Sequence, residues 1–433
     1  MERESGHLSI ETLARWLAGD LPHEVVVREI APHLKAVCSV CGERFRQLQE
    51  LQARVGHWSE TVALFEGREA PSQLARLEQL QISEQLALVE GEEGLRSWAL
   101  CALLIRESQR AVFDAPLRAV ERAEVAVRIA EQLSGEVYDS VWIHDLTARA
   151  WAQLANSRRV LGELLGADQA LRTGFALLER GGTGSPEVEA ELLHVQSALR
   201  RAQRRLPEAL VAADDAMALY HQANASAAMR RLRLSRAKIR EELGDLNGML
   251  AELESLIEEY DSIEAVPAPD VEAENLARAY AHYNLLFALV AAGRSDEASR
   301  RLAEVRNQFG LAGQADRLRL RWLEARIAAG LGRQADAEKI LLEVRSEFFE
   351  RRMGYDAALV ALELATLYAT EGRTAEIKQL ATEVLPLFES REVHREALGA
   401  LILFQRAAEQ ERLTADLARQ VAAFLSRERS LAF

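Results

Sequence analysis

Small and apolar residues recur along the chain with a fixed internal spacing. A small or apolar residue is followed seven positions later by glycine, and five positions after that by a second small or apolar residue within an amphipathic stretch. Apolar residues spaced roughly three or four positions apart on both sides of each glycine predict pairs of helices. The copies are Ala155, Gly162, Ala167; Ala237, Gly244, Met249; Leu286, Gly293, Ala298; Ala325, Gly332, Ala337; Ala365, Gly372, Ile377; a copy without glycine, Ser197, Arg204, Ala209; a degenerate one near Leu417; and an earlier unit around Ala119.

This spacing predicts helical hairpins that stack into an all-α solenoid. The small residue midway along the first helix lets the second helix approach closely, and the glycine supplies the left-handed conformation that ends the first helix. The chain has only 9 Pro and 24 Gly and is rich in Ala, Leu, Glu and Arg, which favours helix throughout. One hairpin cannot bury its apolar face alone, so neighbouring hairpins pack together and leave a concave surface.

The repeated unit resembles the tetratricopeptide repeat family. Two units carry its signature most clearly: Trp151, Leu154, Ala155, Gly162, Ala167; and Leu364, Ala365, Tyr368, Gly372. The units depart from the family in period, because most lie about 40 residues apart where the family has about 34. An insertion at residues 266–270 separates the third and fourth units. The resemblance implies a protein-binding array over residues 93–433.

First-helix side chains that face the concave surface are candidates for binding a protein partner. Aromatic and arginine side chains dominate binding hot spots. The candidates are His194, Arg201, Tyr280, Tyr283, Phe287, Trp322 and Arg326. The alternative for each is packing between helices, since an aromatic side chain at helical spacing usually belongs to the core.

Residues 1–45 follow a different pattern. Two short amphipathic helices are expected there, and the second ends in HLKAVCSVC, which contains His33, Cys38 and Cys41. Thiolates separated by two residues can reach one zinc ion from a tight turn, and a histidine about one turn earlier can join them. A closed structural zinc site needs four ligands, so His7 is the expected fourth ligand and His23 the alternative. A redox-active cysteine pair without metal, or a hairpin without metal, are the other interpretations.

The same segment resembles the zinc-binding anti-sigma factor family. The likeness covers HLSIETLARWLAGDL, the second helix and the His–Cys–x–x–Cys end, with His7 placed 26 residues before His33. Four residues separate His33 from Cys38, whereas three are commonest in the family. The resemblance implies that His7, His33, Cys38 and Cys41 hold Zn²⁺ and that the domain binds a sigma factor, keeping it from RNA polymerase.

Residues 46–92 are expected to form a helical connector that caps the first repeat. Leu48, Leu51, Val55 and Trp58 make one apolar stripe, and REAPSQLARLEQLQISEQLALVEG predicts two short helices. Cys101 follows on an apolar helix and is predicted to be a buried small hydrophobe.

The net charge of the chain limits which kinds of partner it can bind. A net charge of -14 and a pI near 5.3 argue against nucleic-acid binding. No apolar stretch approaches the ~20 residues that span a bilayer, and no leader sequence is recognisable, which predicts a cytoplasmic protein without membrane contact. The chain also contains one basic stretch. This stretch is either helix surface with glutamate partners or a docking patch for an acidic partner. Its residues are Arg200, Arg201, Arg204, Arg205, Arg230, Arg231, Arg233, Arg236, Lys238 and Arg240.

No phosphate-binding loop, dinucleotide fingerprint, nucleophile elbow or zinc-protease motif is found. The sequence therefore predicts a non-enzymatic regulatory adaptor whose partners are proteins, with a sigma factor as the partner that the N-terminal resemblance implies. One alternative is a scaffold of a larger complex with a purely structural zinc domain. Another is a thiol redox sensor in which Cys38 and Cys41 release zinc when oxidised.

Overall fold

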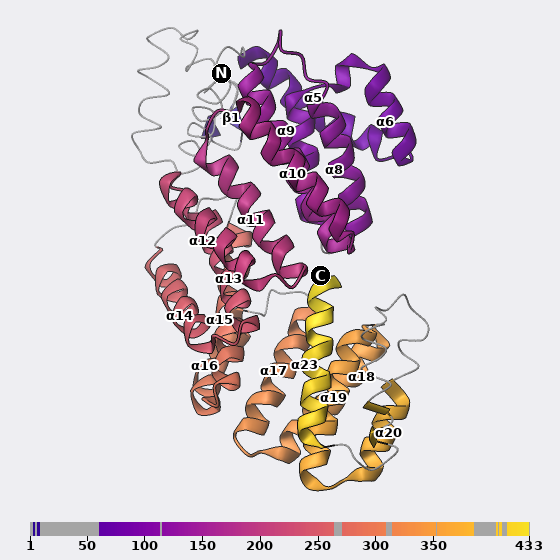
Figure 1. Ribbon diagram of the computed structural model, residues 1–433, viewed down its shortest axis with the longest axis vertical. Coiled ribbons are helices and arrows are strands. Elements are labelled where there is room, and N and C mark those ends of the chain that lie inside the picture. The colour runs from indigo at the N-terminus through magenta and orange to yellow at the C-terminus, as the bar shows by residue number, and fades with distance from the viewer. Residues whose placement is uncertain are drawn as a thin grey trace. The chain divides into compact units, whose positions relative to one another are not determined.

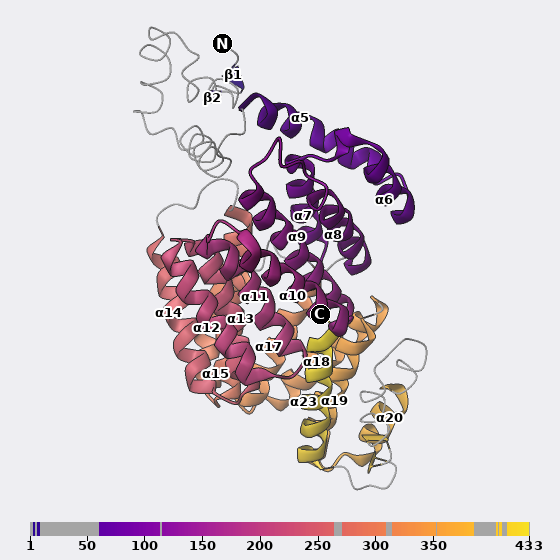
Figure 2. The same ribbon diagram turned by 45° about the horizontal axis from the view of Figure 1, so that its top comes forward.

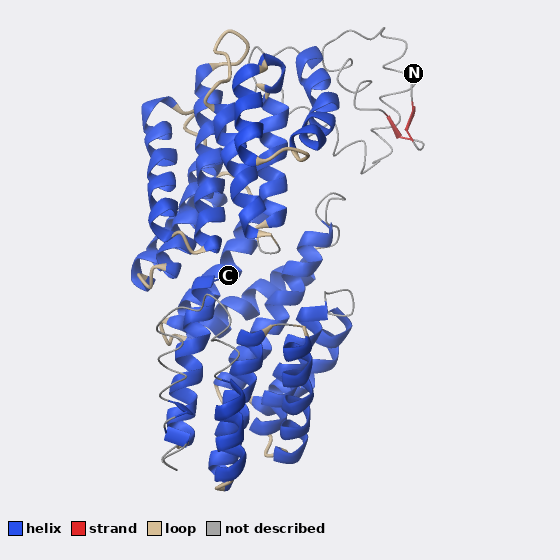
Figure 3. Ribbon diagram, turned by 90° about the vertical axis from the view of Figure 1, so that its right-hand side faces the viewer, coloured by secondary structure: helices blue, strands red, loops and turns tan. Residues whose placement is uncertain are grey.

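The computed structural model describes residues 3–4, 7–8, 60–112, 115–263, 271–308, 314–351, 353–384, 404–405, 407–408 and 414–432. Apart from two antiparallel two-residue strands, β1 (Arg3–Glu4) and β2 (His7–Leu8), every regular element in these ranges is helical (Figure 3). The all-α prediction is therefore confirmed for the described chain. Contacts divide the chain into two compact units: unit 1 (residues 1–232 and 264–272) and unit 2 (residues 233–263 and 273–433).

Unit 1 is built from helical hairpins behind a two-helix cap. Its helices are α5 (Glu60–Leu77), α6 (Ile82–Gly91), the short η2 (Glu93–Leu95), α7 (Trp98–Ala111), α8 (Pro116–Ala130), α9 (Ser140–Leu161), α10 (Leu164–Gly181), α11 (Pro186–Ala202), α12 (Leu206–Gln222) and the first part of α13 (Ser226–Glu242). α5 packs on α7 and α6 packs on α8 (Figure 2). The first helices α7, α9 and α11 contact one another in sequence order, so the hairpins stack side by side (Figure 1).

Unit 2 continues the same hairpin arrangement. It holds the rest of α13 and α14 (Leu246–Ser262), α15 (Val271–Ala291), α16 (Ser295–Gln308), α17 (Gln314–Gly330), α18 (Gln334–Glu350), α19 (Gly354–Glu371), α20 (Thr374–Val384) and α23 (Ala415–Ala432). α17 packs on α18, α18 on α19, and α19 on α20. The helix α23, which contains Leu417 and is yellow in Figure 1, packs along α19.

Most described first helices end in the same turn. Gly162, Gly244, Gly293, Gly332 and Gly372 have φ between 72° and 93°, the left-handed region that glycine enters without a Cβ penalty. After α9, the Glu163 amide donates to the Arg158 carbonyl at 2.9 Å and the Gly162 amide donates to the Arg159 carbonyl at 3.1 Å, which is a Schellman cap. The glycine-free copy adopts this geometry too, with Arg204 at φ 61°.

The small residues of the repeat lie where the two helices of a hairpin cross. Ala155, Ala167, Ala209, Ala298, Ala325, Ala337 and Ala365 are all fully buried. Where serine replaces alanine, its hydroxyl bonds the partner helix: Ser197 Oγ donates to the Ala209 carbonyl at 2.8 Å, and Ser108 Oγ to the Ala119 carbonyl at 2.7 Å. The Ser108 bond shows that α7 and α8 form the earlier unit expected around Ala119.

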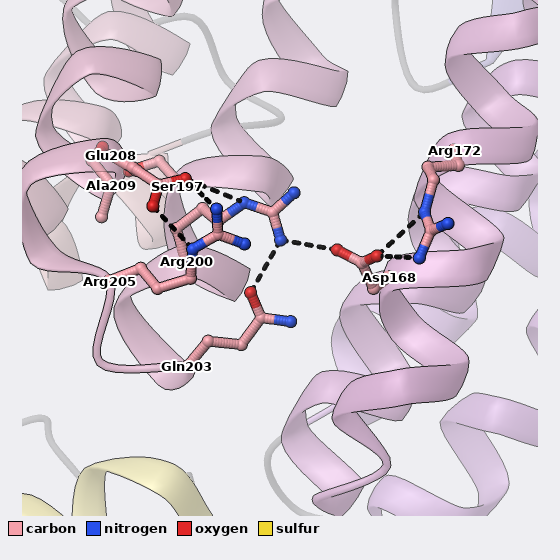
Figure 4. Close-up of polar contacts among 8 residues, drawn as sticks. All are labelled: Asp168, Arg172, Ser197, Arg200, Gln203, Arg205, Glu208 and Ala209. Carbon is pink, nitrogen blue, oxygen red and sulfur yellow. Dashed lines mark hydrogen bonds and ion pairs between the residues drawn. The ribbon is translucent and has the colours of Figure 1, made fainter.

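Polar side chains also join one hairpin of unit 1 to the next. Arg200, on the first helix of the third hairpin, donates to Asp168 on α10 at 2.5 Å and to Gln203 at 2.7 Å (Figure 4). Arg205 donates to Glu208 at 2.6 Å. For these two residues of the basic stretch, the interpretation as helix surface with acidic partners is the correct one.

The repeated turn predicts opposite effects for two identical substitutions. An added Cβ would meet no atom within 4 Å at either Gly332 or Gly67, so only backbone conformation differs between them. Gly332→Ala should lower the free energy of unfolding by about 1 kcal/mol, because it forces alanine into the left-handed region. Gly67→Ala, inside α5, should raise it by up to about 1 kcal/mol through helix propensity. Chemical denaturation measures both, and equal effects would contradict the cap assignment.

Candidate protein-binding groove

The inner face of unit 2 contains a groove of about 1030 Å³. Its walls come mainly from the first helices of successive hairpins, α13, α15, α17 and α19, and from α23, with residues of α16 and α18 completing the lining. Most of the first-helix residues that line it follow the repeat, since they lie one, four or five positions after the buried small or apolar residue of each first helix. They are Lys238, Glu241 and Glu242; Phe287, Val290 and Ala291; Arg326, Ala329 and Gly330; Thr366 and Thr370; with Glu363 and, from α23, Arg419, Ala422 and Ala423.

Arg326 is the most constrained charged group of the groove. Its guanidinium lies 5.0 Å from the ring centroid of Phe287 and 4.9 Å from that of Trp322. Its Nε donates to Glu363 at 2.6 Å, and the other carboxylate oxygen of Glu363 accepts from Trp322 Nε1 at 2.7 Å. Burial by itself would lower the pKa of Arg326, but the Glu363 charge and hydrogen bond raise it above its ordinary value. The side chain is therefore a fixed cation held between two rings.

Phe287 lies between two cations. Lys238 Nζ stands 5.4 Å from its ring centroid and donates to Glu241 at 2.7 Å, while Arg326 faces the same ring. The quadrupole of the ring attracts both cations. The groove thus presents an aromatic surface surrounded by cations and carboxylates that are already paired with each other. A ligand can therefore contact positive or negative side chains without moving them.

The structure separates the seven predicted groove residues into groups. Phe287 and Arg326 line the groove, and Trp322 lies behind Arg326 with 7% of its surface exposed and its ring edge toward Phe348. The α15 residues Tyr280 and Tyr283 pack against the core of unit 2, where Tyr280 donates its hydroxyl to Asp316 at 3.1 Å. His194 and Arg201 belong to α11 of unit 1, not to this groove.

Sequence reasoning missed Glu363 and the contribution of α23, and it named Lys238 only as part of the basic stretch, not among the groove residues. Lys238 occupies the position of Phe287 and Arg326, directly after the buried small or apolar residue, so the repeat register itself could have identified it. Glu363 lies about one repeat away from Arg326 and Trp322 in the sequence. The spacing of residues within one helix therefore could not predict that these side chains pair. The repeat pattern likewise could not predict that α23 forms part of the groove wall.

The predicted zinc ligands His33, Cys38 and Cys41 lie outside the described residues, and of His7 the structure gives only the backbone, in β2. Within the described part of the chain, no group of three or more His, Cys, Asp or Glu side chains could hold a metal ion. Among the helices that the structure describes, none combines the length and the apolar character needed to cross a bilayer.

Comparison with known proteins identifies the fold but no family. No protein-family model matches the chain, and no curated protein sequence is similar to it. Among solved structures, a Rap protein in complex with competence and sporulation factor superposes with a TM-score of 0.55 at 12% identity, covering 77% of this chain and 88% of that one. Aspartyl phosphate phosphatase F from Bacillus subtilis superposes with a TM-score of 0.51 at 10% identity, covering 96% and 97%.

These similarities define the chain as a helical-repeat protein of the tetratricopeptide-like class, as its sequence predicted. A tetratricopeptide repeat protein from Parabacteroides merdae also aligns, at 13% identity over 71% of this chain and 98% of that one, but its TM-score of 0.43 is too low to support a shared arrangement. At such identities the likeness concerns the fold alone.

The pairing of Arg326 predicts a measurable coupling in stability. Glu363→Gln keeps an acceptor for Trp322 but leaves a largely buried cation unpaired, which should lower the free energy of unfolding of the protein by about 2 kcal/mol. Arg326→Met in the same background should restore part of that loss, because it removes the unpaired charge. Chemical denaturation of the two single variants and the double variant measures the coupling.

An exposed ion pair serves as the control for this cycle. Arg321 and Glu343 contact each other at 2.5 Å with side chains 48% and 45% exposed. Glu343→Gln should change the free energy of unfolding by less than about 1 kcal/mol. If Glu343→Gln lowers the free energy of unfolding as much as Glu363→Gln does, the Arg326–Glu363 pair contributes no more to stability than an exposed ion pair.

Proposed function

We propose that this chain is a non-enzymatic regulatory adaptor that binds an extended peptide segment of a partner protein in the groove of unit 2. The observation that carries the proposal is the wall of fixed, mutually paired charges around Phe287 and Arg326. Side chains held in place before binding lose little conformational freedom on binding, which favours affinity.

The size and composition of the groove favour a peptide over a small molecule. Its volume of about 1030 Å³ lies at the upper end of the roughly 300–1,000 Å³ typical of small-ligand pockets. The wall alternates apolar surface, such as Val290 and Ala329, with the hydroxyls of Thr366 and Thr370. Each hydroxyl donates its proton to a carbonyl of its own helix and can still accept a hydrogen bond from a peptide N–H. The solved Rap protein contains bound competence and sporulation factor, which supports a ligand-binding role for this fold.

A binding function fits the groove better than catalysis does. The carboxylate of Glu363 accepts from Arg326 and Trp322, and that of Glu241 accepts from Lys238, so these acids are committed to holding the wall. A general base needs a carboxylate or imidazole free to take a proton from the substrate. The phosphatase named among the similar structures shares the fold at 10% identity, and this supports no transfer of its activity.

A photo-crosslinking residue at two positions tests the groove. In place of Thr370, inside the groove, it should crosslink a partner protein through one discrete peptide segment. In place of Leu342, which lies on the second helix α18 with 40% of its surface exposed, it should not crosslink that segment. Mass spectrometry of the crosslinked peptides identifies the segment, which can then be synthesised.

Binding of the synthetic segment then measures the role of the aromatic surface. Phe287→Ala should weaken binding by about tenfold or more, since aromatic anchors carry much of the energy of such interfaces. Calorimetry with the full chain measures the affinity. Equal crosslinking at both positions, or an affinity unchanged by Phe287→Ala, would place the partner on another surface.

We also propose that His7, His33, Cys38 and Cys41 bind one Zn²⁺ and that the N-terminal segment contacts a sigma factor. The proposal rests on the ligand types, their spacing and the resemblance to zinc-binding anti-sigma factors. Purified full-length protein should contain one zinc per chain, and the double variant Cys38→Ser/Cys41→Ser should contain none and retain no sigma factor in a pull-down.

The third cysteine provides the control. Cys101 is fully buried in α7, its thiol contacts the Ala126 carbonyl at 3.3 Å, and burial raises its pKa, so it is no zinc ligand. Cys101→Ala should keep the zinc. Absence of zinc from the wild-type protein would reject the metal site, while zinc without a bound sigma factor would favour the scaffold interpretation.

A further inference from the structure

One wall of the groove is held in place differently from the others. Among the first helices, Tyr280 of α15 donates its hydroxyl to Asp316 of α17 at 3.1 Å. Arg326 of α17 in turn donates to Glu363 of α19 at 2.6 Å. These walls are therefore tied together by side chains before any ligand binds. The remaining wall is α23, which contributes Arg419, Ala422 and Ala423 to the lining.

The helix α23 has the register of a second helix but the support of one neighbour. Ala418 is its fourth residue and is fully buried, as Ala337 is at the fourth position of α18. However, α18 packs on two first helices, α17 and α19, whereas α23 packs chiefly on α19. The α18 residue Glu338 also accepts a hydrogen bond from Tyr368 of α19 at 2.9 Å.

The described contact of α23 with the core of unit 2 is made by small apolar side chains. Ala418 and Val421 are the α23 residues buried in the cluster that contains Tyr368. The α18 helix buries larger groups in the same cluster, Leu341 and Phe348. Because the free energy of attachment grows with the apolar area that is buried, α23 should separate from its neighbours more easily than α18 does.

Arg419 gives a ligand a way to hold α23. Its side chain is 63% exposed and pairs with Asp416 of the same helix, which is 78% exposed. An ion pair this exposed contributes little free energy, so the guanidinium can exchange Asp416 for a carboxylate of a ligand. By contrast, Arg326 and Glu363 are mostly covered and hold each other. Arg419 is thus the groove cation that a ligand can take over at the lowest cost.

We propose that α23 is a clamp, meaning that it opens locally from α19 in the free protein and is held closed when an acidic peptide in the groove pairs with Arg419. A ligand that contacts α23 only in its closed position shifts the equilibrium toward that position. Occupancy of the groove is thereby coupled to the ordering of α23. This clamp rests on the proposed function, since it requires a peptide in the groove.

Hydrogen exchange of the free, full-length protein tests the opening without any ligand. Mass spectrometry should show that the amides of residues 415–432 exchange at least about tenfold faster than those of residues 334–350, the α18 helix. Equal exchange of the two helices would make α23 a fixed wall. That result would overturn the clamp whether or not the groove binds a peptide.

The synthetic segment identified by crosslinking at Thr370 tests the closing. It should slow the exchange of residues 415–432 by about tenfold or more and change that of residues 334–350 less. In Arg419→Gln, exchange without the segment should equal that of wild type, while the segment binds more weakly and protects α23 less. Calorimetric binding to wild type without protection of α23, or an affinity unchanged by Arg419→Gln, would reject the clamp and leave the proposed function standing. Absence of binding would reject both.

Two neighbouring positions of α23 provide a matched pair of variants. Val421→Glu places a charge in the buried contact with α19, so it should speed the exchange of α23 and weaken binding of the segment by about tenfold or more. Gln420→Glu adds the same charge at an exposed position of the same helix and should change neither. Equal weakening by both would assign the effect to net charge and contradict the clamp.

The exchange of α18 reports on folding in the same measurement. If residues 334–350 also lose protection in Val421→Glu, the milder Val421→Ala takes its place, and it should still speed the exchange of α23 while leaving α18 protected. A Val421→Ala variant with the exchange and affinity of wild type would then overturn the proposal.

Discussion

The structure depends on one repeated constraint, the turn that ends most of its first helices. A residue with positive φ closes the helix through two backbone hydrogen bonds and sends the chain back along it. The second helix can then follow closely only if the residues at the crossing are small, and Ala155, Ala209 and Ala325 are fully buried there. The turn and the crossing together fix the rotation of each first helix, and hence which of its side chains face a ligand.

That fixed rotation brings side chains from several first helices of unit 2 to one groove, where they can pair with one another. In unit 2, Arg326 is stacked between rings and neutralised by Glu363, so the wall is rigid and balanced in charge. In unit 1, Arg159 is buried and donates to the amide oxygen of Asn156 at 3.2 and 2.9 Å. The hairpins of unit 2 share a scaffold, and the side chain directly after the small or apolar residue (Lys238, Phe287 or Arg326) gives the groove its aromatic and charged surface.

The sequence predicted the helices, the hairpins and their register, because those follow from local spacing. Gly244 and Gly332 predict their turns directly, and the spacing placed Arg204 at the glycine position of another copy, where the structure finds the same left-handed conformation. The partners of side chains could not be predicted in this way. Arg326 meets Glu363 only after three helices have packed, and no pattern within one helix indicates that contact. The zinc ligands stay a prediction, as His33, Cys38 and Cys41 lie outside the described residues.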